Sequence, residues 1–457
     1  MDNMPNEAAR TLSRRGHTYA TGAKKTLENV INNLWDPEGN PDGFVSLGVA
    51  ENALMHEELA SYVKDSIQDL QTHAFTYGDS FYGSKRLRSA IAQFVNHRFQ
   101  PNQAVKQEHV VATAGLTNSL EQLAYALGDP GDGFLIGRPY YTSLPKDFGS
   151  RAGIQSIGVA FGDVDPFSMD AILKYEEALI EARKDGVPTK ALFLCSPHNP
   201  LGRCYPREVL VGLMKFCQQQ KIHLISDEIY ALSVWQNPEV PDAVTFESVL
   251  SIDTSGIIDP GLVHVLWGMS KDFGANGLRI GCIISQHNHP LLDAVKANSY
   301  GPQTFPSRPS HSTNSSPYTS LFTYPPSLSD HITSTLLEDT SYTETYIRTN
   351  QLRLAENYAF ATSFLKHHNI PYSAKVNAAF FLWVDLKPLF SNVATEEERS
   401  KQGKELSGAI MERLMAKKVF IANGEAFAGE EPGWFRVVFS QPRAYVEEGL
   451  RRLMSAF

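Results

Sequence analysis

Residues 190–228, KALFLCSPHNPLGRCYPREVLVGLMKFCQQQKIHLISDE, predict a strand, a helix and a second strand in immediate succession. The two apolar runs, ALFLC and IHLIS, are short and hydrophobic, as are strands that are buried on both faces of a parallel sheet. Between them, residues 207–220 place apolar side chains at helical spacing. Because a helix that joins two parallel strands forms a βαβ unit, this stretch indicates an α/β fold.

The same alternation of short strands and helices extends in both directions along the chain. It predicts a mostly parallel central sheet that is flanked by helices. Beyond residue 328 the pattern changes to long helices with isolated strands, which indicates a second, smaller α+β unit. The further strands are expected at 109–115, 134–139, 263–270, 279–285, 379–386 and 434–440.

Four regions follow from this pattern and from composition. Residues 1–50 are expected to form an N-terminal arm and part of the small domain, and residues 51–300 the large domain. Residues 301–327 are rich in Pro, Ser and Thr and lack a helical or strand period, so a flexible insertion is predicted there. Residues 328–457 are expected to form the small C-terminal domain.

Composition excludes several classes of function. The net charge of −9 provides no general attraction to nucleic acid or to anionic membranes. The longest apolar runs are too short to span a bilayer. The four cysteines have no C-x-x-C spacing, so we expect reduced thiols and no metal site. A cytoplasmic location is predicted, with a mitochondrial presequence over residues 8–27 as the alternative.

Polar residues follow three of the predicted strands. Asn199, Asp227 and Lys271 each stand at or just past a strand end, where ligands gather in parallel sheets. Lysine is rarely buried unless it is paired or chemically used. Lys271 is therefore either a surface residue in a turn or an amine that forms a Schiff base with a carbonyl cofactor, with Arg279 nearby to hold a phosphate.

Five segments decide between these readings. They are SLGVAENAL, PHNPLG, SDEIY, SKDFGANGLRIG and GWFRVVFS, and they follow one another from residue 46 to residue 440. Together they resemble the class I/II aminotransferase family of pyridoxal-phosphate enzymes and, within it, the 1-aminocyclopropane-1-carboxylate (ACC) synthase-like group. The resemblance implies an aspartate-aminotransferase-like fold (fold type I), pyridoxal 5′-phosphate as cofactor and an α-amino acid as substrate.

The resemblance assigns catalytic roles to Lys271, Asp227 and Tyr230, and cofactor contacts to Asn199 and Tyr141. Lys271 matches the Schiff-base lysine, which also serves as a base at Cα. Asp227 matches the buried carboxylate that keeps the cofactor's ring nitrogen protonated. Asn199 and Tyr230 match the two donors to its phenolic oxygen. Tyr141 is expected to stack on the ring, with Tyr140 as the alternative.

Phosphate binding needs a helix N-terminus, hydroxyls and an arginine. TAGLTNSLEQL supplies a glycine turn that opens a helix, so the backbone of Leu116 and the hydroxyl of Thr117 are candidates. The resemblance adds Ser270 and Arg279. Gly268 stands where many family members have another phosphate-binding serine, which predicts a slightly poorer phosphate cup.

Three residues are predicted to contact the substrate. Arg436 matches the arginine that binds the α-carboxylate in a bidentate fork. The AEN segment places Glu51 near the substrate side chain. In the segment 77–82, Phe81 falls where plant ACC synthases carry a tyrosine, and Tyr82 is the candidate for that space, with Tyr77 as the alternative. The resemblance also implies a homodimer in which this segment helps to close the partner's site.

These residues predict an enzyme, most simply an aminotransferase. ACC-synthase-type elimination, carbon–sulfur lysis and γ-replacement are the alternatives, because the outcome depends on pocket shape and proton placement. A non-catalytic relative that binds an effector is a further hypothesis. The presence of Lys271, Asp227 and Arg436 favours the enzyme.

Overall fold

The computed structural model describes residues 11–22, 25–68, 70–300 and 324–457. Most of the predicted insertion, residues 301–323, lies outside these described residues, as do the first ten residues of the N-terminal arm. Among the helices that are described, none combines the length and hydrophobicity needed to cross a membrane.

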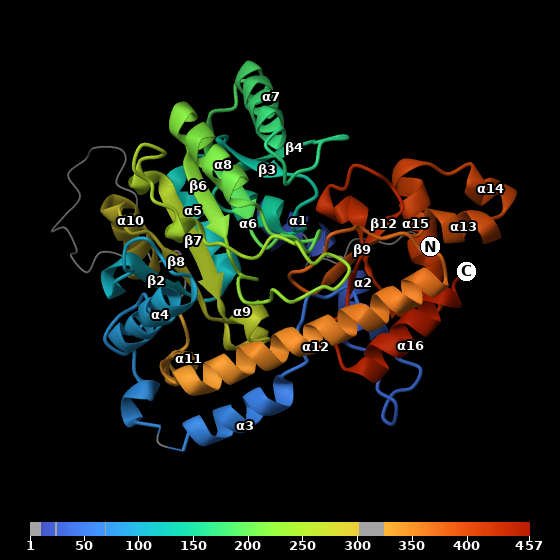
Figure 1. Ribbon diagram of the computed structural model, residues 1–457, viewed down its shortest axis with the longest axis horizontal. Coiled ribbons are helices and arrows are strands. Elements are labelled where there is room, and N and C mark those ends of the chain that lie inside the picture. The colour runs from blue at the N-terminus through green and yellow to red at the C-terminus, as the bar shows by residue number, and fades with distance from the viewer. Residues whose placement is uncertain (1–10, 23–24, 69, 301–323) are drawn as a thin grey trace.

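A seven-stranded sheet forms the centre of the large domain (Figure 1). Every neighbouring pair is parallel except the two that involve β8, which runs antiparallel to β2 and β7. The predicted mostly parallel sheet is thus confirmed. In sheet order the strands are β2 (Val110–Thr113), β8 (Gly281–Ile284), β7 (Val263–Gly268), β6 (His223–Asp227), β5 (Thr189–Cys195), β3 (Gly133–Gly137) and β4 (Gln155–Val159).

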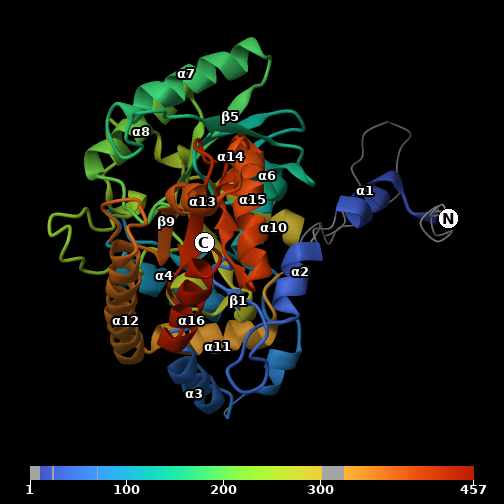
Figure 2. The same cartoon turned by 90° about the vertical axis from the view of Figure 1, so that its right-hand side faces the viewer.

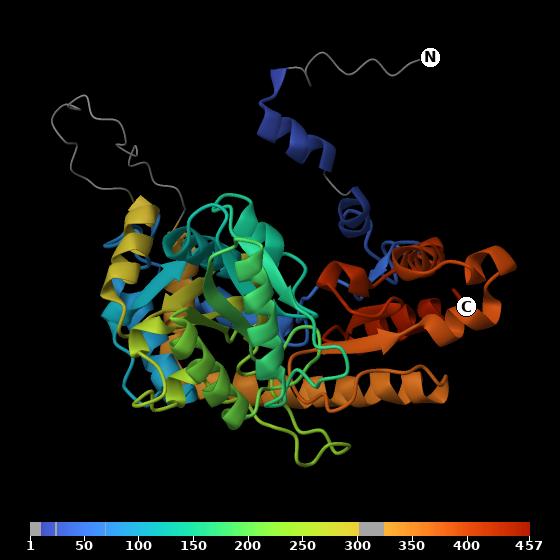
Figure 3. The same cartoon turned by 90° about the horizontal axis from the view of Figure 1, so that it is seen from above.

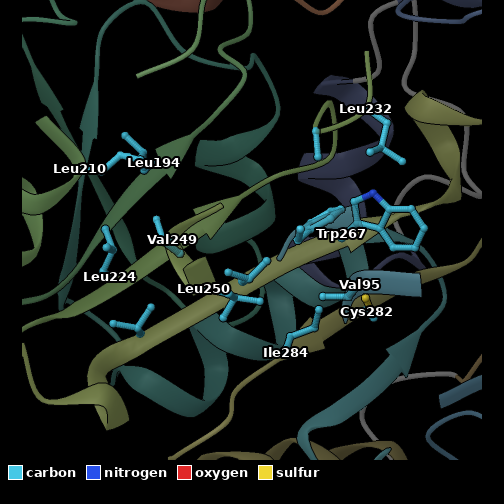
Figure 4. Close-up of a cluster of buried hydrophobic side chains, with 14 of the residues drawn as sticks. Val95, Leu194, Leu210, Leu224, Leu232, Val249, Leu250, Trp267, Cys282 and Ile284 are labelled. Atoms are coloured by element: carbon cyan, nitrogen blue, oxygen red, sulfur yellow. The ribbon is translucent and has the colours of Figure 1, made fainter. Parts of the chain in front are cut away.

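Helices cover both faces of this sheet, because each buried strand directs alternate side chains to opposite faces. One face packs on α5 (Leu116–Leu127), α6 (Leu144–Gly149) and α10 (His289–Tyr300). The other face packs on α4 (Lys85–Arg98), α7 (Ala171–Lys184), α8 (Arg207–Gln220) and α11 (Ser327–Glu338). Figure 4 shows part of this second layer, in which Leu194, Leu224 and Trp267 of three adjacent strands lie in one apolar cluster.

The small domain is built on an antiparallel sheet in the order β11 (Ala422–Asn423), β12 (Trp434–Val438), β9 (Phe381–Asp385). Helices α15 (Gly403–Ala416) and α16 (Arg443–Met454) pack with it in one core. The short strand β1 (Val45–Ser46) pairs in parallel with β10 (Val419–Phe420), so a segment from the start of the chain joins this part of the molecule.

One helix, α12 (Thr340–His367), runs along both parts (Figure 1). Near its start, the Tyr346 hydroxyl donates to Phe273 O over 2.7 Å, in the large domain. Farther along, Asn357 Nδ2 donates to Phe439 O over 2.8 Å, in the small domain. Helix α11, at the beginning of the predicted small domain, packs against α4 of the large one. The domain boundaries themselves stay a prediction.

The first two helices, α1 (Arg14–Gly22) and α2 (Lys25–Ile31), extend away from the rest of the molecule (Figures 2 and 3). Leu27 and Ile31 are both exposed. This arm therefore presents apolar side chains to its surroundings.

Candidate active site

The candidate site lies at one edge of the central sheet. Strands β2, β5, β6 and β7 run in the same direction, so their carboxyl ends meet there, and the antiparallel β8 begins there. The segments that follow or precede these ends carry most of the predicted site residues, namely Leu116, Thr117, Asn199, Asp227, Tyr230, Ser270, Lys271 and Arg279. Stretches far apart in sequence therefore converge on one place.

Lys271 lies in a four-residue helix, α9 (Met269–Asp272), directly after β7. Its side chain is half-buried, and Nζ donates a hydrogen bond to Ala50 O over 2.6 Å. Burial, together with the neighbouring Arg436 cation, lowers the pKa of this amine to about 8. The lysine is therefore not a solvated turn residue, and its amine is more readily deprotonated than that of an ordinary lysine.

Asp227 ends β6 and is buried. The one hydrogen bond of its carboxylate among the described residues comes from Ile229 N to Oδ1, over 3.1 Å. Burial raises the pKa of this carboxyl to about 7, although Lys271 acts in the opposite direction. A buried carboxylate with so little compensation fits a cationic partner, because a nearby positive charge favours the ionised form.

Arg436, on β12, is a buried cation. Nη1 donates to Asn199 Oδ1 and Nη2 to Gly48 O, each over 2.8 Å. The guanidinium lies 4.4 Å from the ring centroid of Phe381 and 4.7 Å from that of Phe427. No carboxylate among the described residues pairs with it, and Nε has no hydrogen-bond partner. Burial lowers the pKa of this group to about 10. The site thus presents a desolvated cation without an anionic partner among the described residues.

Three neighbours of Arg436 have side chains that suit binding of a flat polar ligand. Because Asn199 Oδ1 accepts from Arg436, its amide N–H groups face elsewhere as donors. Burial raises the pKa of the Tyr230 phenol well above its usual value, so the group stays a neutral donor. Tyr141 is half-buried and lies close enough to influence the pKa of both Tyr230 and Arg436.

The start of α5 and the loop before β8 approach each other closely at three glycines, where the phosphate cup is predicted. A Cβ on Gly115, whose φ is +87°, would stand 2.2 Å from Arg279 Nη2. A Cβ on Gly281 would stand 2.7 Å from Gly115 C, and one on Gly268 would stand 2.6 Å from Ile280 O. The backbone is therefore closely packed here, and the first amides of α5 lie beside it, as in sites that bind phosphate. The close approach at Gly268 leaves no space for a serine side chain at this position.

The remaining predicted site residues, Glu51 and Tyr82, make no hydrogen bond to Lys271 or Arg436 in the part of the chain that the structure describes. Glu51 is exposed, yet its charge raises the pKa of Lys271, so the two side chains lie within electrostatic range. The Tyr82 ring lies between Arg88 and Lys296, with centroid distances of 4.6 and 5.5 Å. Its role in substrate binding stays a prediction. The Phe81 ring contacts those of Tyr77 and Tyr324 at 6.0 and 5.3 Å.

Sequence reasoning missed several contacts. The carbonyls of Gly48 and Ala50 lie within the SLGVAENAL segment. The resemblance pointed to this segment but did not predict that its backbone carbonyls accept from Arg436 and Lys271. The two rings beside Arg436 were also missed. Phe381 stands in a predicted strand, whereas Phe427 lies in a segment without a motif, and only the structure reveals it.

Comparisons with known proteins agree with this geometry. The family model described as "Aminotransferase class I and II" matches residues 42–453. The chain is 33% identical over 414 residues to the probable aminotransferase aclI of Aspergillus oryzae, which covers 90% of each chain. It is 28% identical over 450 residues to 1-aminocyclopropane-1-carboxylate synthase 6 of Arabidopsis thaliana, covering 95% of this chain and 82% of that one.

Solved structures show the same architecture. The aspartate aminotransferase of Thermus thermophilus with maleate superposes with a TM-score of 0.70 at 21% identity, covering 98% of this chain and 100% of that one. At this identity the likeness concerns the fold alone. The predicted fold class is confirmed.

Proposed function

The chain belongs to the aminotransferase class I and II family, and we propose that it is an aminotransferase that acts on an α-amino acid with pyridoxal 5′-phosphate carried by Lys271. Enzymes of this family depend on this cofactor and act on small amino acids, so the broad class is established. One observation carries the finer proposal: the buried Arg436 cation lies beside Asn199 without an anionic partner among the described residues.

The residues of the site fit pyridoxal 5′-phosphate. The Lys271 amine, with its lowered pKa, suits attachment to the cofactor's carbonyl carbon. The weakly compensated Asp227 suits a protonated ring nitrogen. The amide of Asn199 and the neutral phenol of Tyr230 suit a phenolate oxygen, because both are donors.

The glycine-walled cup suits the phosphate. We assign its donors to the backbone amide of Leu116, the hydroxyls of Thr117 and Ser270, and the guanidinium of Arg279. Tyr141 is assigned to the face of the ring. Each of these residues belongs to the same edge of the sheet, where the backbone approaches closely at Gly115 and Gly281.

When bound, pyridoxal 5′-phosphate supplies an electron sink that stabilises negative charge at the amino-acid Cα. Lys271 moves the Cα proton, which its pKa of about 8 allows near neutral pH. Arg436 binds the α-carboxylate in its planar fork, and Asn199 fixes the plane of that fork. Glu51 is proposed to face the substrate side chain.

Transamination is the proposed outcome. The relative from Aspergillus oryzae is named a probable aminotransferase, and Phe81 replaces the tyrosine that the resemblance associates with ACC formation. The second candidate is elimination or replacement at the side chain, which the similarity to an ACC synthase supports. Both outcomes use the same residues to bind the cofactor and the carboxylate. Only the product therefore distinguishes them.

Product analysis tests the proposal. The purified protein is incubated with a panel of L-amino acids and a keto-acid acceptor, and keto acid, ammonia, thiol and ACC are measured. Transfer of the amino group with no free ammonia supports transamination. Ammonia, thiol or ACC as the main product contradicts it in favour of the second candidate. Borohydride reduction followed by peptide mapping should find the cofactor on Lys271, and label on another lysine would overturn that assignment.

We further propose a homodimer with a two-fold axis. The side chains of Phe75 and Tyr77 are 78% and 73% exposed, and Leu27 and Ile31 of the arm are also exposed, which suits burial against a second copy. The segment 77–82 is the proposed contribution to the partner's site. Sedimentation at micromolar concentration tests this, since a monomer with full turnover is incompatible with a shared site.

A further inference from the structure

A short segment of the small domain is bonded directly to the large domain beside Arg436. We call residues 424–430, between β11 and β12, the strap. Glu430 is its last residue, and its carboxylate accepts from two backbone amides of the large domain. Phe161 N donates to Oε1 over 2.8 Å, and Gly162 N donates to Oε2 over 3.0 Å. The strap is thus attached at one end by a bidentate contact.

The large domain reaches back to the strap in turn. Arg138 Nε donates to Ala428 O over 2.7 Å, and Tyr140 N donates to Phe427 O over 2.8 Å. The side chains of Arg138 in the large domain and Glu430 in the strap therefore hold the same segment, and Phe427 lies directly before Ala428, to which Arg138 donates. Its ring is fully buried and meets Trp383 edge-on at 5.6 Å.

The two rings that enclose Arg436 are held in different ways. Phe381 belongs to β9, which is paired with β12, so it moves with Arg436 as part of one sheet. Phe427 belongs to the strap, and its place depends on the bonds across to the large domain. If those bonds were lost, the guanidinium would keep its contact with Phe381 and lose the fixed position of Phe427.

We propose that Glu430 and Arg138 are positioning residues for amino-acid binding: they fix the strap, and the strap fixes Phe427 against the Arg436 guanidinium. A guanidinium that stays in contact with both rings is restricted in orientation, so it is already oriented when a carboxylate arrives. Less conformational entropy is then lost on binding. This inference rests on the proposed function of Arg436 as the carboxylate-binding residue.

Glu430→Ala is the first variant, and Glu431→Ala is its matched control. Glu431 is the next residue and is also exposed, but it contacts Lys387 and Trp434 within the small domain. In Glu430→Ala, amide hydrogen exchange at Phe161 and Gly162 should accelerate. The dissociation constant of the best amino-acid substrate, followed through cofactor absorbance, should rise by about 3- to 10-fold, as expected for hydrogen bonds to a partly solvated charge.

The turnover number at saturation and the cofactor content should stay near those of the wild-type protein, because none of the strap's hydrogen bonds described above involves Lys271 or Ala50, to which Lys271 donates. Glu431→Ala should change none of these values. Glu430→Gln keeps one acceptor oxygen and should give an intermediate dissociation constant. If Glu430→Ala does not fold, Glu430→Gln provides the test of amide exchange and amino-acid affinity. Arg138→Ala tests the contact from the large domain with the same measurements.

Faster exchange with unchanged amino-acid affinity would overturn the inference, because the strap would then be bonded without positioning Arg436. Unchanged exchange would also overturn it, since Glu430 would not hold the segment. These results differ from failure of the proposed function. In that case Arg436→Lys would itself leave the affinity unchanged in the same assay.

Discussion

Arg436 and Asn199 are joined by a 2.8 Å hydrogen bond between Nη1 and Oδ1, which connects a strand of the small domain to the end of a strand in the large one. This bond occupies the oxygen of the Asn199 amide and leaves its N–H groups as donors to other partners. A change at this one residue therefore affects both the proposed carboxylate grip and the proposed cofactor contacts.

Asn199→Asp should weaken amino-acid binding more than Asn199→Ala does. An aspartate would place an anion against the buried Arg436 and compete with the substrate carboxylate, whereas alanine only removes a neutral acceptor. A charge-assisted pair of this kind is worth about 2–5 kcal/mol. Amino-acid titration of both variants measures the difference, and equal affinities would show that Arg436 does not hold the substrate.

Arg436→Lys and Lys271→Ala should separate binding from chemistry. Lysine keeps the charge but loses the planar fork, so amino-acid affinity should fall by about 2–5 kcal/mol while cofactor content is retained. Lys271→Ala should still bind amino acid, with turnover abolished. Affinity and turnover, measured on both proteins, check this contrast. Retained turnover in Lys271→Ala would contradict the assigned role.

Gly268→Ser should weaken the cup, although the resemblance places a phosphate-binding serine there. The added Cβ would stand 2.6 Å from Ile280 O and 2.9 Å from Gly281 Cα, both backbone atoms. Overpacking of this kind costs about 1–3 kcal/mol. Gly277→Ala is the control, since nothing lies within 4 Å of its Cβ position. Cofactor retention on dialysis and Tm measure the effect; tighter retention in Gly268→Ser would contradict it.

Acid should destabilise the protein through a pair of histidines at the opposite edge of the sheet. His223 Nδ1 and His264 Nε2 lie 2.9 Å apart, and His264 Nδ1 lies 2.9 Å from Ser285 Oγ. Burial lowers the pKa of both rings, that of His264 well below its usual value, while Asp259 acts in the opposite direction on His223. The unfolded chain therefore binds more protons than the folded protein once pH falls below about 6.5.

The stability that the neutral histidine pair contributes is present above about pH 6.5 and is lost as the pH falls below that value. His223→Gln keeps a polar side chain without titrating in this range, so the free energy of unfolding should fall less steeply between about pH 7 and pH 5 than in the wild-type protein. Denaturant titrations at each pH provide the measurement. Identical slopes for the two proteins would exclude the histidine pair as the source.

The sequence predicted those parts of the molecule in which local pattern and final environment agree. Strands β5, β6 and β7 are continuous apolar runs, and burial on both faces demands that composition. The edge strand β4 was missed, since its half-exposed residues QSIGV carry no such run. Lys271 and Asp227 were found because motifs mark them. Phe427 was not, since its position depends on bonds between segments far apart in the chain.

The pairing of β1 with β10 has a consequence for synthesis of the chain. Val45 pairs with Val419, and Arg452 in α16 donates to the carbonyls of Pro41 and Gly43. The early segment therefore stays unpaired until residues 419–452 have been synthesised. Such distant contacts form slowly, because a long loop must close first. The large domain is able to begin assembly before that point, whereas the small domain is completed only after α16 has emerged.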